Sequence, residues 1–312
     1  MVEVRQFLAL SGFRTAVFVG GANDLRATLQ RAVAAAAGAM DRIGVPADFA
    51  GLYGRTGLEL RPGGEEFSRG RGVYDVRRRM IILEGPADES AFAYAFSQAL
   101  DHMLGDLLHG VRRSQANLPL LSAALPRYLG SGYHHERLNL LPPAILCFRF
   151  ERLPMLTESH RSYQDPRGEE GGLVHQWLRS VVALRWRARE DGWVTRTRAY
   201  EDALRAEDRR NPEWAAPQNM MARAFAAWAA PENGQVSGAT TDANRAVAAG
   251  GLGDGIDRRT LRIMEAMQPV LRSAALAWRE RLDTGMAVVK EEEAGDESAM
   301  TPSGAAGCLM GN

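Results

Sequence analysis

Tyr94 and Gln98 stand one helical turn apart in the segment AFAYAFSQALDH, residues 91–102. Side chains four residues apart on a helix share a face, so groups at this spacing can bind one ion, one water or each other. A phenol ionises only near pH ~10, and a neutral amide is a poor zinc ligand. The pair is therefore better suited to hydrogen bonding than to metal chemistry.

Histidine is the residue type that would most readily supply a metal site or a general base. The six histidines are His102, His109, His134, His135, His160 and His175. His102 and His109 are two turns apart, too far for one ion, and His102 is expected to be packed or hydrogen-bonded. His134 and His135 precede Glu136, but neighbours in a strand point to opposite faces, so a shared ion would need loop geometry. A surface loop is the simpler interpretation.

Nucleophilic and phosphate-binding chemistry have little support in the sequence. Ser131 and His134 can be paired on paper, but no nucleophile elbow surrounds a serine. Cys147 lies in the apolar segment AILCFRF, which is typical of a buried element. The glycine-rich residues 250–255 lack the Lys and Ser/Thr of a phosphate-binding loop, so they are predicted to be a flexible connector.

Arginine runs interleaved with tryptophans indicate a second class of function, the binding of a polyanion. The residues concerned are Arg77, Arg78, Arg79, Arg112, Arg113, Arg209 and Arg210, with Trp177, Trp186, Trp193 and Trp214. The chain has 38 Lys+Arg against 38 Asp+Glu, so no global charge attracts nucleic acid. Solvated faces and intramolecular ion pairs are the favoured interpretation.

Composition bounds the remaining choices. A chain of 312 residues that is 46% hydrophobic and 24% charged can bury a substantial core. Its two cysteines, Cys147 and Cys308, argue against a disulfide framework and a cysteine-rich zinc site. No secretory signal and no run of ~18–20 apolar residues is present, so a soluble protein of the host cytoplasm or of an assembly is expected, with no membrane partner.

Hydrophobic periodicity predicts the elements that must position these residues. Strands are expected at 13–19, 57–61, 73–76 and 80–83, and helices at 25–44, 89–110, 173–189, 195–208, 217–230 and 258–282. Asn23 or Asp24 would cap the first helix, and residues 87–90 the second. Residues 1–285 are predicted to form one domain, followed by a flexible acidic tail at 286–312. This order of elements predicts an α+β fold.

Four short segments carry a resemblance to a known family. They are Ser11-Gly12-Phe13-Arg14 with the strand after it, the strand at 80–83, the ALDH of residues 99–102, and Met221-Ala222-Arg223-Ala224-Phe225 followed by Ala226-Ala227-Trp228. In this order they resemble the first class of large-polyvalent-protein-associated domains, found in bacteriophages and other mobile elements. The similarity extends from about residue 12 to residue 230. It implies a zincin-like fold, with a small N-terminal sheet, a central helix and a mostly helical C-terminal half.

The resemblance also implies where a catalytic site would lie. In that family the helix before ALDH carries an H-E-x-x-H pattern, in which two imidazoles bind zinc and the Glu activates a water. A later helix supplies a third, carboxylate ligand. The corresponding positions here are Tyr94, Ala95, Gln98 and Asn219, so all four have changed. No metal, no cofactor and no catalytic residue is therefore expected, and Tyr94, Gln98 and Asn219 are predicted to form a polar plug.

The resulting expectation is a catalytically inactive zincin-like protein of phage or mobile-element origin. It would act as a structural or interaction component, with a virion as one setting and with itself or other virion proteins as partners. Two alternatives stay open. One is a metal-dependent peptidase with displaced ligands drawn from His102, His134, His135 and His160. The other is an accessory protein that binds nucleic acid through its arginine-rich patches.

Overall fold

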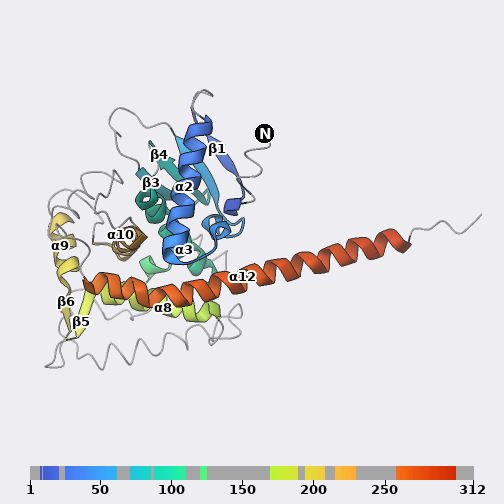
Figure 1. Ribbon diagram of the computed structural model, residues 1–312. Helices are drawn as coiled ribbons and strands as arrows, with labels where there is room; N and C mark the ends of the chain where they lie inside the picture. The colour runs from blue at the N-terminus through green and yellow to red at the C-terminus, as the bar shows by residue number, and fades with distance from the viewer. Residues whose placement is uncertain are drawn as a thin grey trace, which may run out of the picture.

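The computed structural model describes residues 8, 10–20, 25–61, 71–85, 88–109, 120–124, 169–188, 194–207, 215–229 and 258–299. These residues combine helices with a small sheet, which confirms the predicted α+β class (Figure 1). Helices α2 and α3 lie against the sheet, and the later helices gather on the far side of α3. None of the described helices is long and apolar enough to span a bilayer.

The sheet has the order β1-β2-β4-β3. Its strands are β1 Ala16–Phe18, β2 Gly57–Arg61, β3 Arg71–Asp75 and β4 Met80–Glu84. The first three in this order are parallel to one another, and β3 is antiparallel to β4. The register pairs Leu58 with Ile81 and Leu60 with Leu83, so alternate residues of the two central strands point into the core. The four predicted strands are confirmed, although β1 is shorter than expected.

Helices α2 (Leu25–Ile43) and α3 (Glu89–His109) enclose the core with the sheet. Asp88 caps α3, because its Oδ1 accepts the Ala91 N–H at 2.7 Å, as the sequence predicts for this region. Strand β3 lies directly on the first turn of α3, where a Cβ at Gly72 would overlap the carbonyl oxygen of Ala91. The start of α3 is thus fixed by a cap and by close backbone packing. The residues predicted to cap α2 lie outside the described ranges.

Gly12 belongs to the first segment of the family resemblance, and the local structure explains why this position needs a glycine. The chain crosses itself where residues 11–13 meet the 3-10 helix η2 (Ala47–Gly51). Gly12 has φ +65°, and a Cβ on it would overlap the carbonyl oxygen of Asp48. Only glycine satisfies both constraints, so this crossing holds the N-terminal segment against the core.

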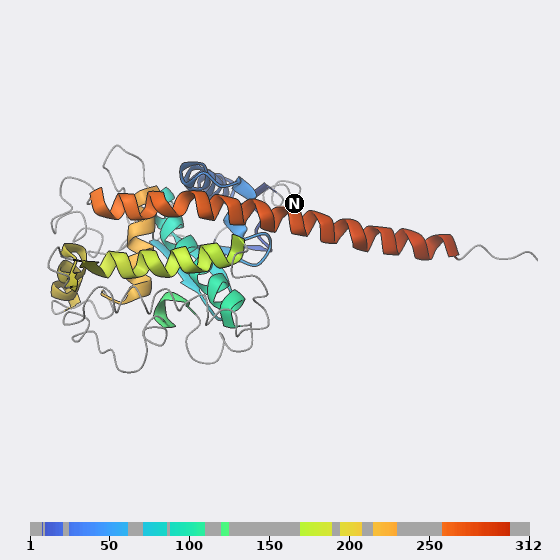
Figure 2. The ribbon, with the colours of Figure 1, turned by 90° about the horizontal axis from the view of Figure 1, so that it is seen from below.

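The C-terminal half is mostly helical, with α8 Glu169–Arg185, α9 Arg198–Glu207, α10 Pro217–Ala229 and α12 Arg258–Ala299. Helix α10 packs on α3, and α8 lies beside α12 (Figure 2). Two predicted helices need correction, because residues from the end of 173–189 and the start of 195–208 form a hairpin of β5 (Trp186–Ala188) and β6 (Val194–Arg196). Thr197 then caps α9, where its Oγ1 accepts the Tyr200 N–H at 3.1 Å.

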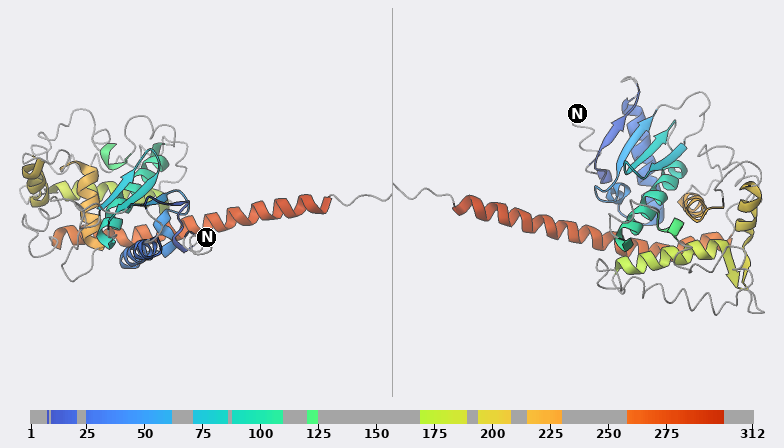
Figure 3. Two further views of the ribbon diagram at one scale, coloured as in Figure 1. Left: turned by 90° about the horizontal axis from the view of Figure 1, so that it is seen from above. Right: turned by 180° about the vertical axis from the view of Figure 1, so that it is seen from behind.

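Helix α12 corrects a further expectation. The sequence pattern predicts a helix that ends near Leu282, whereas α12 continues to Ala299. Lys, Glu and Ala between Val289 and Ala299 are good helix formers, and no proline interrupts the stretch. Its first half packs against α8 and α10, and the remainder projects from the body (Figure 3).

Candidate functional site

The four positions that the family resemblance assigns to a zinc site lie on α3 and α10, two helices that pack on each other. Aromatic contacts hold the two helices together, with the Phe96 and Phe225 ring centroids 5.9 Å apart. This packing places Tyr94 opposite Asn219, a residue 125 positions later in the chain. The Tyr94 hydroxyl donates a long hydrogen bond of 3.4 Å to Asn219 Oδ1. Two of the four positions, Tyr94 and Asn219, are therefore brought together.

The other two positions have different surroundings. Gln98 Oε1 accepts the backbone N–H of Tyr74 at 3.4 Å, which links α3 to β3 rather than completing a plug with Tyr94. Ala95 is 0% exposed and belongs to the hydrophobic core. Of the three residues of the predicted plug, Tyr94 and Asn219 contact each other. Gln98 instead forms a hydrogen bond to the backbone of β3.

This donor set does not fit a zinc ion. Zinc in proteins is bound by imidazole, thiolate or carboxylate, and these positions present a phenol, a methyl group and two neutral amides. Across the described ranges, no group of three or more His, Cys, Asp or Glu residues is placed to hold a metal. Metal-assisted hydrolysis therefore cannot be assigned to Tyr94, Ala95, Gln98 and Asn219.

His102 lies one helical turn after Gln98 on α3. It belongs to a row of interacting polar side chains that starts on β3 and ends in the β3–β4 turn. Its Nδ1 lies 2.8 Å from the Tyr74 hydroxyl, and its Nε2 lies 3.8 Å from Asp106 Oδ1. Asp106 Oδ2 is in turn 2.6 Å from Arg79 Nη2. His102 is only 1% exposed, which confirms that it is packed and hydrogen-bonded. Within the described part of the structure, the His102 side chain is therefore closed off from solvent.

Burial determines the direction in which the pKa values of His102 and Tyr74 are shifted. Loss of solvent lowers the pKa of His102, and the Asp106 carboxylate only partly opposes that effect. Burial likewise raises the pKa of Tyr74. Both shifts favour a neutral imidazole hydrogen-bonded to a neutral phenol at pH 7. The arrangement joins α3 to β3 and stabilises their packing.

Asp101, beside His102, forms a polar cluster that the sequence did not identify. Its Oδ1 accepts the backbone N–H of Ser122 at 2.9 Å, the Ser122 hydroxyl at 2.9 Å and the Trp177 indole N–H at 2.7 Å. Burial raises the pKa of Asp101 to about 7, against these hydrogen bonds, which lower it. Ser122, in the 3-10 helix η4 (Ser122–Ala124), bonds to Asp101 rather than to His102, so these residues do not form a catalytic triad.

The described part of the arginine-rich surface is largely engaged within the molecule. Arg78 pairs with buried Glu59, and Arg79 pairs with Asp106. Of the three arginines in the run 77–79, only Arg77 has a side chain without an acidic partner among the described residues. Burial would raise the pKa of Glu59, but hydrogen bonds from Arg61 and Arg78 outweigh it and lower that pKa. These ion pairs agree with the interpretation favoured from the sequence.

The two described tryptophans of this set, Trp177 and Trp186, do not form a surface for binding nucleic acid. Trp177 and Trp186 are both buried, so neither presents a face on which a base could stack. The remaining candidates lie outside the described ranges: Arg112, Arg113, Arg209, Arg210, Trp193, Trp214, Ser131, His134, His135, Glu136, Cys147, His160 and residues 250–255.

Comparison with protein-family models, with curated protein sequences and with solved structures gives no match to this chain.

Proposed function

We propose that this chain is a zincin-like protein without catalytic activity, of phage or mobile-element origin, which acts as a structural or interaction component of a virion. The observation that supports the proposal most directly is the contact between Tyr94 and Asn219. In the proposed ancestral site these positions would bind one zinc ion, and here they bind each other. Ala95, in the position of the catalytic base, is part of the core. The scaffold is then retained for its surfaces.

The shape of α12 supports an interaction role. The helix is 42 residues long, and it packs on the described body as far as about Leu282. Beyond that part, the helix runs clear of the other elements that the structure describes. Under the proposal, this extension is one of the surfaces that other virion proteins or further copies of the chain bind.

The first experiment measures the metal content of the purified, untagged protein by elemental mass spectrometry. The protein is exposed to zinc and then exchanged extensively into metal-free buffer. We expect no zinc to remain bound in a stoichiometric amount. About one zinc per chain would contradict the proposal and direct attention to the remaining histidines, each of which would then be changed to alanine.

A gain-of-function variant tests the mapping of the site itself. The combination Tyr94→His, Ala95→Glu, Gln98→His and Asn219→Glu should bind zinc and unfold at a higher temperature when zinc is added. Without metal it should be less stable than the wild type, since Ala95→Glu places a carboxylate in the core. The matched control, Gln98→His alone, should gain no zinc-dependent stability. A folded quadruple variant that ignores zinc would show that the mapping is wrong.

The structural role has its own test. Light scattering should find a defined oligomer, or the protein should be present at a fixed copy number in purified phage particles. A strictly monomeric chain that is absent from particles would remove the virion role while leaving the metal result unaffected.

A further inference from the structure

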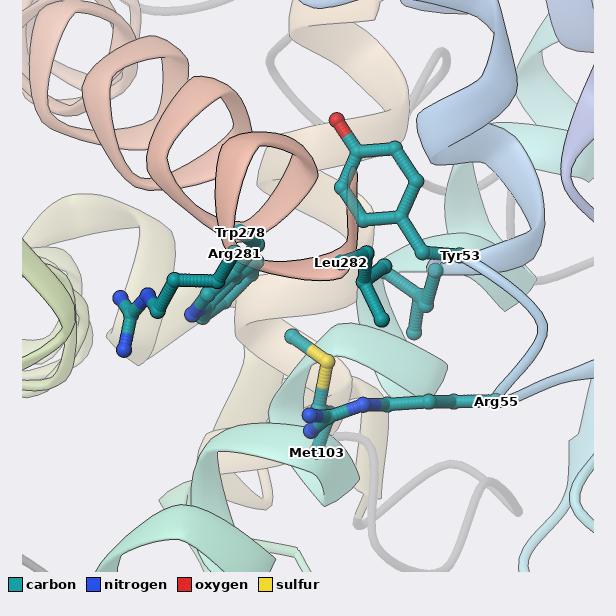
Figure 4. Close-up of a pocket in the computed structure, with 7 residues that line it drawn as sticks. Tyr53, Arg55, Met103, Trp278, Arg281 and Leu282 are labelled. Atoms are coloured by element: carbon teal, nitrogen blue, oxygen red, sulfur yellow. The ribbon is translucent and has the colours of Figure 1, made fainter. Parts of the chain in front are cut away.

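A pocket of about 150 Å³ lies where α12 leaves the body, between that helix, α3 and the turn after η2 (Figure 4). It is lined by Leu52, Tyr53, Arg55, Met103, Trp278, Arg281 and Leu282. None of these residues belongs to the positions of the proposed ancestral zinc site. The pocket is therefore a separate feature from that site.

The inner wall of the pocket is apolar and held in place by the core. Trp278 stacks on Phe49, with ring centroids 5.7 Å apart and an angle of 29° between the planes. Leu52 and Met103 are buried beside it. Because these side chains are packed from behind, the apolar surface is preformed and needs little ordering when a ligand binds.

The turn that builds one side of the pocket is strained. Leu52, Tyr53 and Gly54 have φ values of 51°, 53° and 82°, three consecutive left-handed residues of which only one is glycine. For the two others this conformation is unfavourable, because it brings Cβ too close to the following carbonyl oxygen. The turn is held by a 2.8 Å hydrogen bond from the Tyr53 hydroxyl to the Ala275 carbonyl of α12, and by one of 2.7 Å from Gly54 N–H to Gly12 O. Strained backbone of this kind concentrates at binding sites.

The residue that follows the strained turn, Arg55, places a positive charge at the pocket. Figure 4 shows its side chain extended toward Met103. Its guanidinium makes no hydrogen bond or ion pair with any residue that the structure describes. Arg281, on α12, adds a second guanidinium, with its Nε 3.4 Å from the Ala277 carbonyl. None of the described residues that line the pocket is acidic, and Asp48 in η2 is paired with Arg279 at 3.4 Å.

From this combination we propose that the pocket binds a small carboxylic acid with a single aromatic ring. A cavity of this volume accommodates a body about as large as benzene. The ring would lie against Trp278, Leu52 and Met103. The carboxylate would pair with Arg55, because a guanidinium donates to both oxygens of a carboxylate at once. This binding function is independent of whether the zincin-like proposal holds.

Benzoate and its neutral analogue benzamide test the proposal directly, since they share a ring and differ in charge. Titration of the full chain, followed by calorimetry and by the indole N–H signals in NMR, should show benzoate binding about tenfold more tightly than benzamide, a difference of about 1.4 kcal/mol. Added salt should weaken benzoate binding and leave benzamide nearly unaffected. If neither compound binds, or if both bind equally, the proposal is wrong.

Three single substitutions locate the site. Arg55→Gln should weaken benzoate about tenfold without altering benzamide binding or the unfolding temperature, because Arg55 is exposed. Arg77→Gln, an equivalent change at an exposed residue of the β3–β4 turn, is the control and should leave both affinities unchanged. Leu282→Trp should fill the pocket and abolish binding of both compounds, and Leu282 is 44% exposed, so the chain should still fold. Equal benzoate affinities in the Arg55 and Arg77 variants would overturn the assignment.

Discussion

The Trp177 indole N–H points at Asp101 Oδ1 across 2.7 Å, which joins α8 to α3 in the interior of the protein. Three donors meet at this one oxygen, whereas Oδ2 is buried and has no hydrogen-bond partner within the described ranges. A carboxylate in this position accepts hydrogen bonds from three buried donors, which stabilises the fold. Its negative charge is destabilising there, because a buried charge loses its interaction with water. That balance makes Asp101 a sensitive point for the stability of the fold.

Asp101 should make stability depend on pH. Its folded-state pKa, about 7, lies above the ordinary value of 3.8, so the folded protein binds the proton more tightly than the unfolded chain. Its contribution to the free energy of unfolding should therefore fall as pH rises from about 4 to 7. Asp101→Asn keeps an acceptor for Trp177 and Ser122 but does not ionise, so it should lose this dependence.

Urea unfolding of both proteins between pH 4 and 8 provides the measurement. The lowered pKa of His102 acts in the opposite direction, because stability is lost as pH falls below 6.5. That background is common to both proteins, so the difference between them isolates Asp101. A constant difference across this range would contradict the prediction.

A second prediction concerns the hydrogen bond between Tyr74 and His102. Tyr74→Phe leaves His102 Nδ1 buried without its 2.8 Å partner, and should lower the free energy of unfolding by about 1–3 kcal/mol. Tyr94→Phe is the matched comparison, since its hydrogen bond to Asn219 is 3.4 Å long and should contribute less than about 1 kcal/mol. Denaturant unfolding at pH 7 measures both. An equal loss in the two variants would show that the Tyr74 bond has no special weight.

The close approach of β3 to α3 gives the third prediction. Gly72→Ala would force a Cβ into the carbonyl oxygen of Ala91, and should destabilise the protein by about 3 kcal/mol or more. At Gly54 an added Cβ meets nothing within 4 Å, so Gly54→Ala should cost only about 1 kcal/mol for its left-handed backbone. Thermal unfolding should rank the two variants in this order, and the reverse order would refute the packing argument.

Much of the fold could be predicted because the signals are local. The periodicity of α2 and the cap at Asp88 are properties of a few neighbouring residues, and the structure agrees with both. The β5–β6 hairpin was missed because three-residue strands carry almost no periodic signal. Thr197, a good capping residue, was the available sign that a helix begins at Arg198 rather than at Thr195.

The polar interior was harder to predict, because its partners are distant in sequence. Trp177 lies 76 residues from Asp101, and buried Glu59 pairs with Arg61 and with Arg78, which lies 19 residues away. Tyr94 and Asn219 were paired through a family resemblance, since no spacing rule relates helices 125 residues apart. For Asp101 the one local sign was a carboxylate between the apolar residues Leu100 and Leu104.

The projecting half of α12 also determines how the molecule moves in solution. An α-helix rises about 1.5 Å per residue, so the stretch from Leu282 to Ala299 adds about 26 Å to one side of the body. A 34.1 kDa protein with such an arm experiences more friction than a sphere of the same mass, and it should sediment more slowly and tumble anisotropically. The arm is also a spacer, since a molecule attached at its tip would be held at a set distance from the sheet and its core.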